Sequence, residues 1–161
     1  FAVSANQIKN LVKSVPSAVH RIKIWEFTAS KIDQKIIMGW GLNASKHMPG
    51  GKDQIYSIEG ENTFHKIGSA LLLHPHSVIL QIWLELGLPG IVLYLGLVVY
   101  IINATVKPYR LKFESAMAFG QFLTLMVIAN LSYGAWQAWW IATLWLSASL
   151  MAMVLEKPKT Q

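Results

Sequence analysis

The sequence predicts an all-α membrane protein: a polytopic helical bundle with a long loop containing amphipathic helices, the C-terminal part of a larger bundle. Of the 161 residues 53% are hydrophobic and only 14% are charged, and the mean hydropathy is +0.39, a composition far from that of a soluble domain. Three apolar blocks have roughly the 20 residues that a membrane-spanning helix needs: residues 90–106, 115–133 and 135–155. They show no period-2 alternation, so helices are expected rather than strands.

The distribution of positive charge predicts the orientation of these spans. The net charge is +6, and basic residues fill the short loop after the first block and the C-terminal tail: Lys107, Arg110, Lys112, Lys157 and Lys159. The positive-inside rule places both on the cytoplasmic side, so the uncharged turn at 132–137 and the long segment 1–75 face the other side. The expected division is therefore a loop region over 1–75 and, over 76–161, a re-entrant or short helix with about three spanning helices.

Two further features bear on the class of protein. The chain begins at Phe1 and shows no signal-peptide pattern there, so we expect it to be a fragment of something larger. It contains no cysteine, which excludes a disulfide or a cysteine metal site within these residues.

Residues 17–36 are predicted to form an amphipathic helix that lies against the membrane surface or the mouth of the bundle. Pro16 marks its start, and apolar residues follow at alternating spacings of three and four: Ile22, Trp25, Ala29, Ile32 and Ile36. Arg21 and Trp25 are i,i+4 neighbours on one side of this helix. A guanidinium suits phosphate oxygens and an indole suits a sugar ring. An interfacial helix also commonly carries both residue types without any function.

The stretch after this helix is predicted to be irregular. Gly39 and Gly41 allow positive φ and a tight turn. Residues 43–69 are polar and rich in glycine, which predicts an irregular, mobile loop that acts as a lid or binds an acceptor. His47 and His65 in this loop are interpreted as surface histidines.

The boundary between the polar and apolar parts is the candidate site. A helix is expected to start at 75–77, because proline suits a first turn, and His76 would stand in that turn, where N–H groups attract phosphate. Ser77, Gln81 and Glu85 recur every four residues as one polar stripe. A carboxylate so near hydrocarbon should face a cavity or bond another helix, and the sequence leaves both open. Residues 87–90, Gly-Leu-Pro-Gly, should then kink the helix.

Three motifs together resemble the bacterial O-antigen ligase and polymerase superfamily of polytopic inner-membrane enzymes. They are RIKIW at 21–25, MGWG at 38–41, and His76-Ser77 followed by nine residues and Gly87. The resemblance implies a glycan transferase that takes a polysaccharide from undecaprenyl diphosphate on the periplasmic face of the inner membrane and passes it to a lipid A core sugar. It also implies that His76 is the essential histidine and that Arg21 is an essential arginine near the donor diphosphate.

The chemistry of that transfer agrees with the residues. The acceptor hydroxyl needs a base near neutrality, which histidine supplies, and the leaving diphosphate needs cationic or N–H donors. The assigned residues are His76 and Arg21 as catalytic, and as substrate-binding Trp25, His74, Ser77, Gln81 and Glu85. No cofactor is expected, since no phosphate-binding glycine loop appears. The absence of an Asp-x-Asp pair, together with what the resemblance implies, favours metal-independent transfer. Membrane lipids and the remaining helices of a full-length protein are expected partners, and nucleic acid is not.

Three alternatives stay open from the sequence. A polysaccharide polymerase of the same superfamily would use the same donor chemistry with another acceptor. A metal site could form from His74 and His76 with His47 or His65. A non-catalytic lipid-linked glycan transporter subunit would explain the helices without needing His76.

Overall fold

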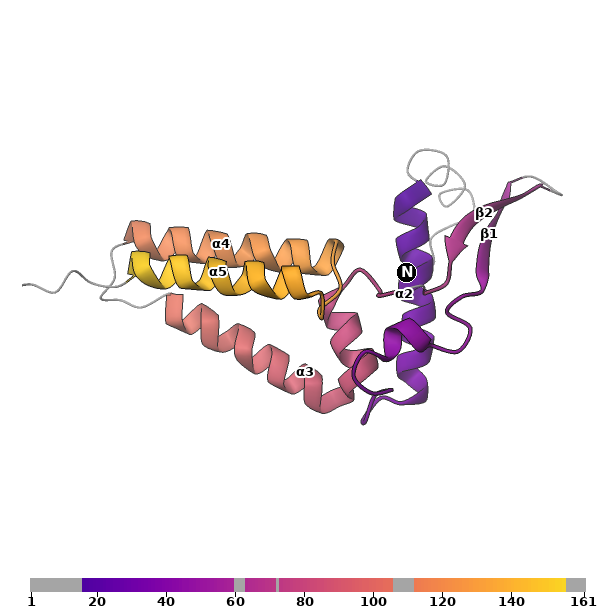
Figure 1. Ribbon diagram of the computed structural model, residues 1–161, viewed down its shortest axis with the longest axis horizontal. Helices are drawn as coiled ribbons and strands as arrows, with labels where there is room; N and C mark the ends of the chain where they lie inside the picture. Colours follow the sequence, from indigo (N-terminus) through magenta and orange to yellow (C-terminus); the bar gives the residue numbers. More distant parts are fainter. Residues whose placement is uncertain (1–15, 60–62, 72, 106–111, 156–161) are drawn as a thin grey trace, which may run out of the picture.

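The computed structural model describes residues 16–59, 63–71, 73–105 and 112–155, and they form a mostly helical fold (Figure 1). Its elements are α2 (Pro16–Gln34), the short 3-10 helix η1 (Ala44–His47), the strands β1 (Gln54–Glu59) and β2 (Thr63–Ser69), α3 (Val78–Thr105), α4 (Lys112–Leu131) and α5 (Ala138–Leu155). The helices α4 and α5 run side by side, and the second part of α3 runs obliquely to them, whereas α2 and the strands lie at one end of this bundle and run across it (Figure 1). The predicted helical membrane fold is confirmed.

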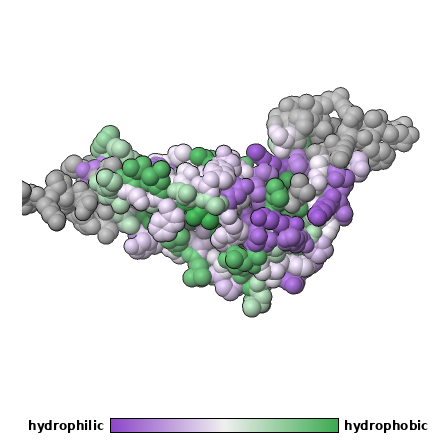
Figure 2. Space-filling model, viewed as in Figure 1, coloured by the Kyte–Doolittle hydropathy of each residue, from purple (hydrophilic) through white to green (hydrophobic). Residues whose placement is uncertain are grey.

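The three C-terminal helices differ in how well they suit a membrane. Among the described residues, α3 and α4 are long and apolar enough to cross a bilayer, and the apolar part of α5 is shorter. Large apolar side chains on these helices point outward, for example Leu93 at 74% exposure and Trp145 at 71%, as lipid-facing side chains do. Figure 2 shows hydrophobic residues along this bundle and hydrophilic ones gathered at the end with α2 and the strands.

The helix α2 begins at Pro16 and ends at Gln34, close to the predicted 17–36. Of the predicted apolar positions, Ile32 is buried inside the protein, whereas Ile22 and Ile36 are exposed. The contact of this stripe with a membrane surface stays a prediction. The buried positions follow a neighbouring stripe, namely Val19, Ile24, Thr28 and Ile32. This second stripe has the same helical period, and packing against Leu84 of α3, Met48 and Leu71 selects it.

A β-hairpin replaces part of the predicted irregular loop. The strands β1 and β2 pair antiparallel from Gln54 opposite Ser69 to Glu59 opposite Thr63, with a bulge between Ile55 and Tyr56. The expectation of an irregular segment over 43–69 is therefore wrong for these strands. Their β-branched and aromatic residues flank a polar, glycine-containing cluster, a pattern typical of a hairpin. The high glycine content of the whole segment led instead to the prediction of an irregular loop.

A kink at Gly87 divides α3 and creates a backbone interlock. Gly87 has φ 66° and ψ −156°, which interrupts the helix as expected from residues 87–90. The carbonyl oxygens of Leu84 and Glu85, which an unbroken helix would use internally, accept hydrogen bonds from the N–H groups of Trp40 (2.8 Å) and Gly41 (2.9 Å). Beyond the kink, the N–H of Leu88 donates to the carbonyl oxygens of Ile36 and Ile37. The segment after α2 therefore fits into the break in α3.

Gly39 lies at the closest point of this interlock. It has φ 65°, which confirms the positive φ expected there, and a Cβ at this position would lie 2.5 Å from the carbonyl oxygen of Glu85. Glycine is therefore needed at residue 39 both for its conformation and for the close backbone approach.

Candidate active site

Three helices meet at the segment 74–77, just before α3. The indole Nε1 of Trp25 on α2 donates a 2.8 Å hydrogen bond to the carbonyl oxygen of Pro75. The hydroxyl of Ser77 donates to Asn130 Oδ1 on α4 (3.3 Å) and accepts from the N–H of Leu80, as a helix N-cap does. The histidine segment is thus held by α2, α3 and α4 together.

His76 differs from its predicted position. The helix α3 begins at Val78, so the expectation that His76 stands in the first helical turn is wrong. It has a positive φ of 53°, a left-handed conformation that is uncommon for a residue with a Cβ and costs on the order of 1–2 kcal/mol. Because Ser77 takes the capping position, His76 is displaced to the loop side of the helix start. A strained backbone held in place by its surroundings is a frequent feature of functional sites.

The imidazole of His76 has a defined hydrogen-bond partner. Its Nδ1 lies 2.8 Å from the carbonyl oxygen of Ser132, at the end of α4. A carbonyl oxygen only accepts, so Nδ1 must carry the proton. In the neutral ring, Nε2 then has a free lone pair and can accept a proton.

His74 packs against His76 and stays neutral. The two rings meet edge to face with centroids 4.4 Å apart, and His74 Nδ1 accepts from the backbone N–H of His76 at 3.3 Å. Burial, followed by the nearby positive charge of His76 and of Lys46, lowers the pKa of His74 from 6.5 to about 4. His74 is therefore uncharged at neutral pH. Its assignment to substrate binding remains a prediction.

Arg21 lies one turn before Trp25 on α2 and is half-buried. Trp25 reaches Pro75, which separates the two histidines, so the structure brings the Arg21–Trp25 side of α2 toward the histidine segment. The preceding residue His20 bonds the carbonyl oxygen of Ser69 through Nε2 (3.0 Å), which fixes α2 against β2. Arg21 and Trp25 remain predicted substrate contacts.

The rest of the polar stripe is buried inside the protein. Glu85 is fully buried, and its two oxygens accept hydrogen bonds from the N–H of Asn43 (2.6 Å), the hydroxyl of Ser45, the amide of Gln81 (3.1 Å) and the indole of Trp136. Every one of these partners donates, as a carboxylate requires. This geometry favours a structural role for Glu85, and its assignment to substrate binding remains a prediction.

Gln81 is the second buried member of the stripe, with 3% exposure. Its Nε2 donates to Glu85 Oε1, and its Oε1 accepts from the backbone N–H of Ala135 at 2.8 Å. Of the two alternatives left open for the Glu85 carboxylate, a cavity or a bond to another helix, the structure shows hydrogen bonds to the turn between α4 and α5 and to the segment around η1.

Several partners in this site could not be recognised from the sequence. The backbone carbonyl of Ser132 leaves no residue signature, and the hydrogen bond from the indole of Trp136 to Glu85 joins residues 51 positions apart in the chain. Asn130 on α4 forms a contact between helices, because its Oδ1 accepts hydrogen bonds from the hydroxyl of Ser77 and the N–H of Ile79. Charge-free polar residues near a turn are the signal that could have pointed to this region.

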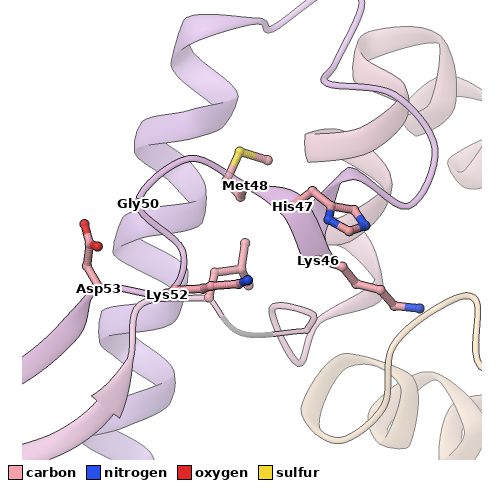
Figure 3. Close-up of a pocket in the computed structure, with 7 residues that line it drawn as sticks. Lys46, His47, Met48, Gly50, Lys52 and Asp53 are labelled. Atoms are coloured by element: carbon pink, nitrogen blue, oxygen red, sulfur yellow. The ribbon is translucent and has the colours of Figure 1, made fainter.

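A shallow depression of about 280 Å³ lies beside η1 (Figure 3). Its lining residues are Lys46, His47, Met48, Gly50, Lys52, Asp53 and Leu71. None of the seven predicted site residues lines it. His47 is exposed here, as expected of a surface histidine.

Among the described residues, no group of three or more His, Cys, Asp or Glu side chains is arranged to hold a metal ion. The metal site considered from the sequence needed His47 or His65 beside the His74–His76 pair. The absence of a metal requirement stays a prediction.

Comparison with known proteins identifies the family. The O-antigen ligase family model matches residues 1–95. Proteins named "Putative polysaccharide ligase" are similar over most of this chain: 37% identical over 98% of it in Rickettsia conorii, 36% over 98% in Rickettsia felis and 38% over 88% in Rickettsia bellii. The chain spans 37%, 37% and 32% of these relatives' lengths, and no solved structure gives a significant match. The chain therefore belongs to the O-antigen ligase family.

Proposed function

We propose that this chain carries the catalytic histidine of an O-antigen ligase, which transfers a polysaccharide from undecaprenyl diphosphate to a sugar of the lipid A core on the periplasmic face of the inner membrane. The observation that carries the proposal is the hydrogen bond between His76 Nδ1 and the carbonyl oxygen of Ser132. It assigns the proton to Nδ1 and leaves Nε2 to act as a base. Family membership supports the class of reaction.

The proposed reaction has one bond-forming and one bond-breaking event. The oxygen of an acceptor sugar hydroxyl forms a bond to the anomeric carbon of the donor glycan. The bond from that carbon to the diphosphate oxygen breaks, undecaprenyl diphosphate leaves with the electron pair, and the hydroxyl proton passes to His76 Nε2. The donor already stores the energy for transfer, so no nucleotide is consumed.

Arg21 is proposed to take up charge on the leaving diphosphate. Its guanidinium offers several N–H donors in a planar fork that matches phosphate oxygens, and it lies one turn from Trp25, which is fixed against Pro75. Stabilising the charge that develops on a leaving group commonly contributes a large share of a rate enhancement. Trp25 and His74 would line the donor side of the same region.

The first test uses the full-length protein in membranes, an undecaprenyl diphosphate-linked glycan as donor and lipid A core as acceptor, with EDTA present. We expect transfer by the parent protein and a loss of at least about 100-fold in His76→Ala, as for removal of a general base. The matched control is His47→Ala, which removes an exposed histidine and should retain near-parental transfer. Transfer by His76→Ala at the parental rate would show that His76 is not the base.

The same assay separates the alternatives. Elongation of the donor glycan without transfer to lipid A core would identify a polymerase. Movement of the lipid-linked glycan that survives His76→Ala, with no transfer by the parent, would identify a transporter. Loss of the parent's activity in EDTA that added Mg²⁺ restores would contradict metal independence.

A further inference from the structure

We propose that Gln81 and Glu85 are positioning residues, which hold the turn 132–136 so that the carbonyl of Ser132 keeps His76 in the tautomer with a free Nε2. In this role the two residues act through the turn and not by contact with substrate. The inference rests on the proposed function for its catalytic consequence, but the tautomer itself can be measured without activity.

The two residues hold the turn at adjacent positions. Gln81 Oε1 accepts from the backbone N–H of Ala135 at 2.8 Å, and Glu85 accepts from the indole N–H of Trp136. Gln81 and Glu85 are joined by their own hydrogen bond of 3.1 Å. Both lie on the first part of α3, one turn apart, so one rigid element fixes both points.

The turn is also fixed at its start. The N–H of Ser132 donates to the carbonyl of Ile128 at 2.9 Å, which continues α4. The position of the Ser132 carbonyl is therefore set between the end of α4 and the contacts at Ala135 and Trp136. His76 precedes α3 by two residues, so the element that carries Gln81 and Glu85 also carries the histidine that the turn must meet.

Close packing also holds the histidine segment 74–77 in a fixed position relative to the turn 132–136. A Cβ on Gly134 would lie 2.9 Å from ring atoms of His74, so the turn approaches the histidine pair through a glycine. A shift of the turn by about an ångström would break the 2.8 Å contact between Ser132 and His76. The ring could then protonate on Nε2 and lose its function as a base.

Glu85 is suited to this role because it satisfies donors from two separate segments. Besides Trp136 it receives the N–H of Asn43 and the hydroxyl of Ser45, which lie 42 and 40 residues earlier in the chain. With 0% exposure and its oxygens occupied by these donors, it does not serve as a proton acceptor for substrate. Removing the charge would leave buried N–H groups without an acceptor.

The test compares Trp136→Phe with Trp145→Phe in the full-length protein. The first variant removes the indole N–H that binds Glu85 and keeps an aromatic ring, and the second makes the same change on the exposed face of α5. We expect Trp136→Phe to lower kcat by about 10- to 100-fold with KM within about twofold, as for misplacement of a catalytic group. Trp145→Phe should match the parent.

The tautomer is read by ¹⁵N NMR of histidine-labelled protein in lipid nanodiscs, with the His76 signals assigned by their loss in His76→Ala. The parent and Trp145→Phe should show His76 protonated on Nδ1, and Trp136→Phe should show a mixture that includes the Nε2-protonated form. Gln81→Met, which keeps the side-chain length and removes both hydrogen bonds, should give the same mixture if Trp136→Phe fails to fold.

An unchanged Nδ1-protonated signal in the folded variants would overturn the positioning role. If Trp136→Phe loses the Nδ1-protonated signal while His76→Ala still transfers glycan, the proposed function is contradicted and the positioning role stands. Parental kcat in Trp136→Phe, with His76→Ala inactive, would contradict the positioning role alone.

Discussion

At the scale of single residues, His74 should make stability depend on pH. Its pKa is lowered from 6.5 to about 4 in the folded protein, so between these values the unfolded chain binds more protons than the folded one. Folding stability contributed by His74 is fully present above pH 6.5 and falls as pH drops toward 4. We expect a smaller loss of Tm between pH 7 and pH 5 in His74→Asn, which keeps an acceptor near Nδ1, than in the parent.

Thermal unfolding of both proteins in the same detergent measures this difference, and the other histidines contribute alike to both. An equal loss of Tm would mean that His74 is not held neutral.

The sequence indicated both histidines of the site and the arginine one turn from Trp25. It could not indicate that one histidine is buried and neutral while the other is bonded to Ser132, because burial and a backbone acceptor 56 residues away depend on tertiary packing.

At the scale of elements, the kink in α3 should be intolerant of any side chain at Gly87. With φ at 66°, Gly87→Ala would adopt a left-handed conformation that costs on the order of 1–2 kcal/mol, and its Cβ would collide with the carbonyl oxygen of Ile37. The matched control is Gly96→Ala on the same helix, where a Cβ meets nothing within 4 Å. We expect Gly87→Ala to lose folded protein or Tm and Gly96→Ala to be neutral or slightly stabilising.

Detergent-solubilised yield and Tm of the two variants decide this point, and equal values would contradict the interlock.

The break in α3 could be predicted from residues 87–90, and α2 could be predicted from its 3.6-residue period and Pro16, because these signals are local. The face of α2 that packs inside the protein could not be predicted, since Ile24 and Thr28 repeat with the same helical period as the predicted Ile22 and Ile36, and only the partner surface distinguishes the two faces. The hairpin was not predicted, because the glycine and polar residues of the segment 43–69 indicated an irregular loop and the two strands are short.

At the scale of the whole molecule, the polar end and the bundle are joined at the candidate site as well as at the interlock in the kink of α3. Hydrogen bonds connect α2, the loop before η1, α3 and the α4–α5 turn, and they involve the side chains of Trp25, Glu85, Gln81, Ser77 and His76. The end of α3 and the start of α4 lie at the far end of the bundle from α2 and the hairpin, as does the end of α5 (Figure 1). The site therefore lies at the end of the bundle where charged and apolar parts meet.

This arrangement makes a topology prediction. Two of the basic residues between α3 and α4, Lys107 and Arg110, lie outside the described residues, and Lys112 starts α4. The positive-inside rule places that end of the bundle in the cytoplasm, and α2, the hairpin and the turn 132–137 at the opposite end then face the periplasm. Because these 161 residues contain no cysteine, single cysteines can report each side.

We expect Asp53→Cys and Tyr133→Cys in spheroplasts to react with a membrane-impermeant maleimide, because both positions are exposed at the α2 end. Lys159→Cys should react only after the membrane is permeabilised. Any cysteine elsewhere in a full-length protein is replaced by serine first, and the cysteine-free parent gives the background. Labelling of Lys159→Cys in intact spheroplasts, with protection of Asp53→Cys, would reverse the orientation. It would also move His76 to the cytoplasmic face, where a periplasmic transfer to lipid A core could not take place.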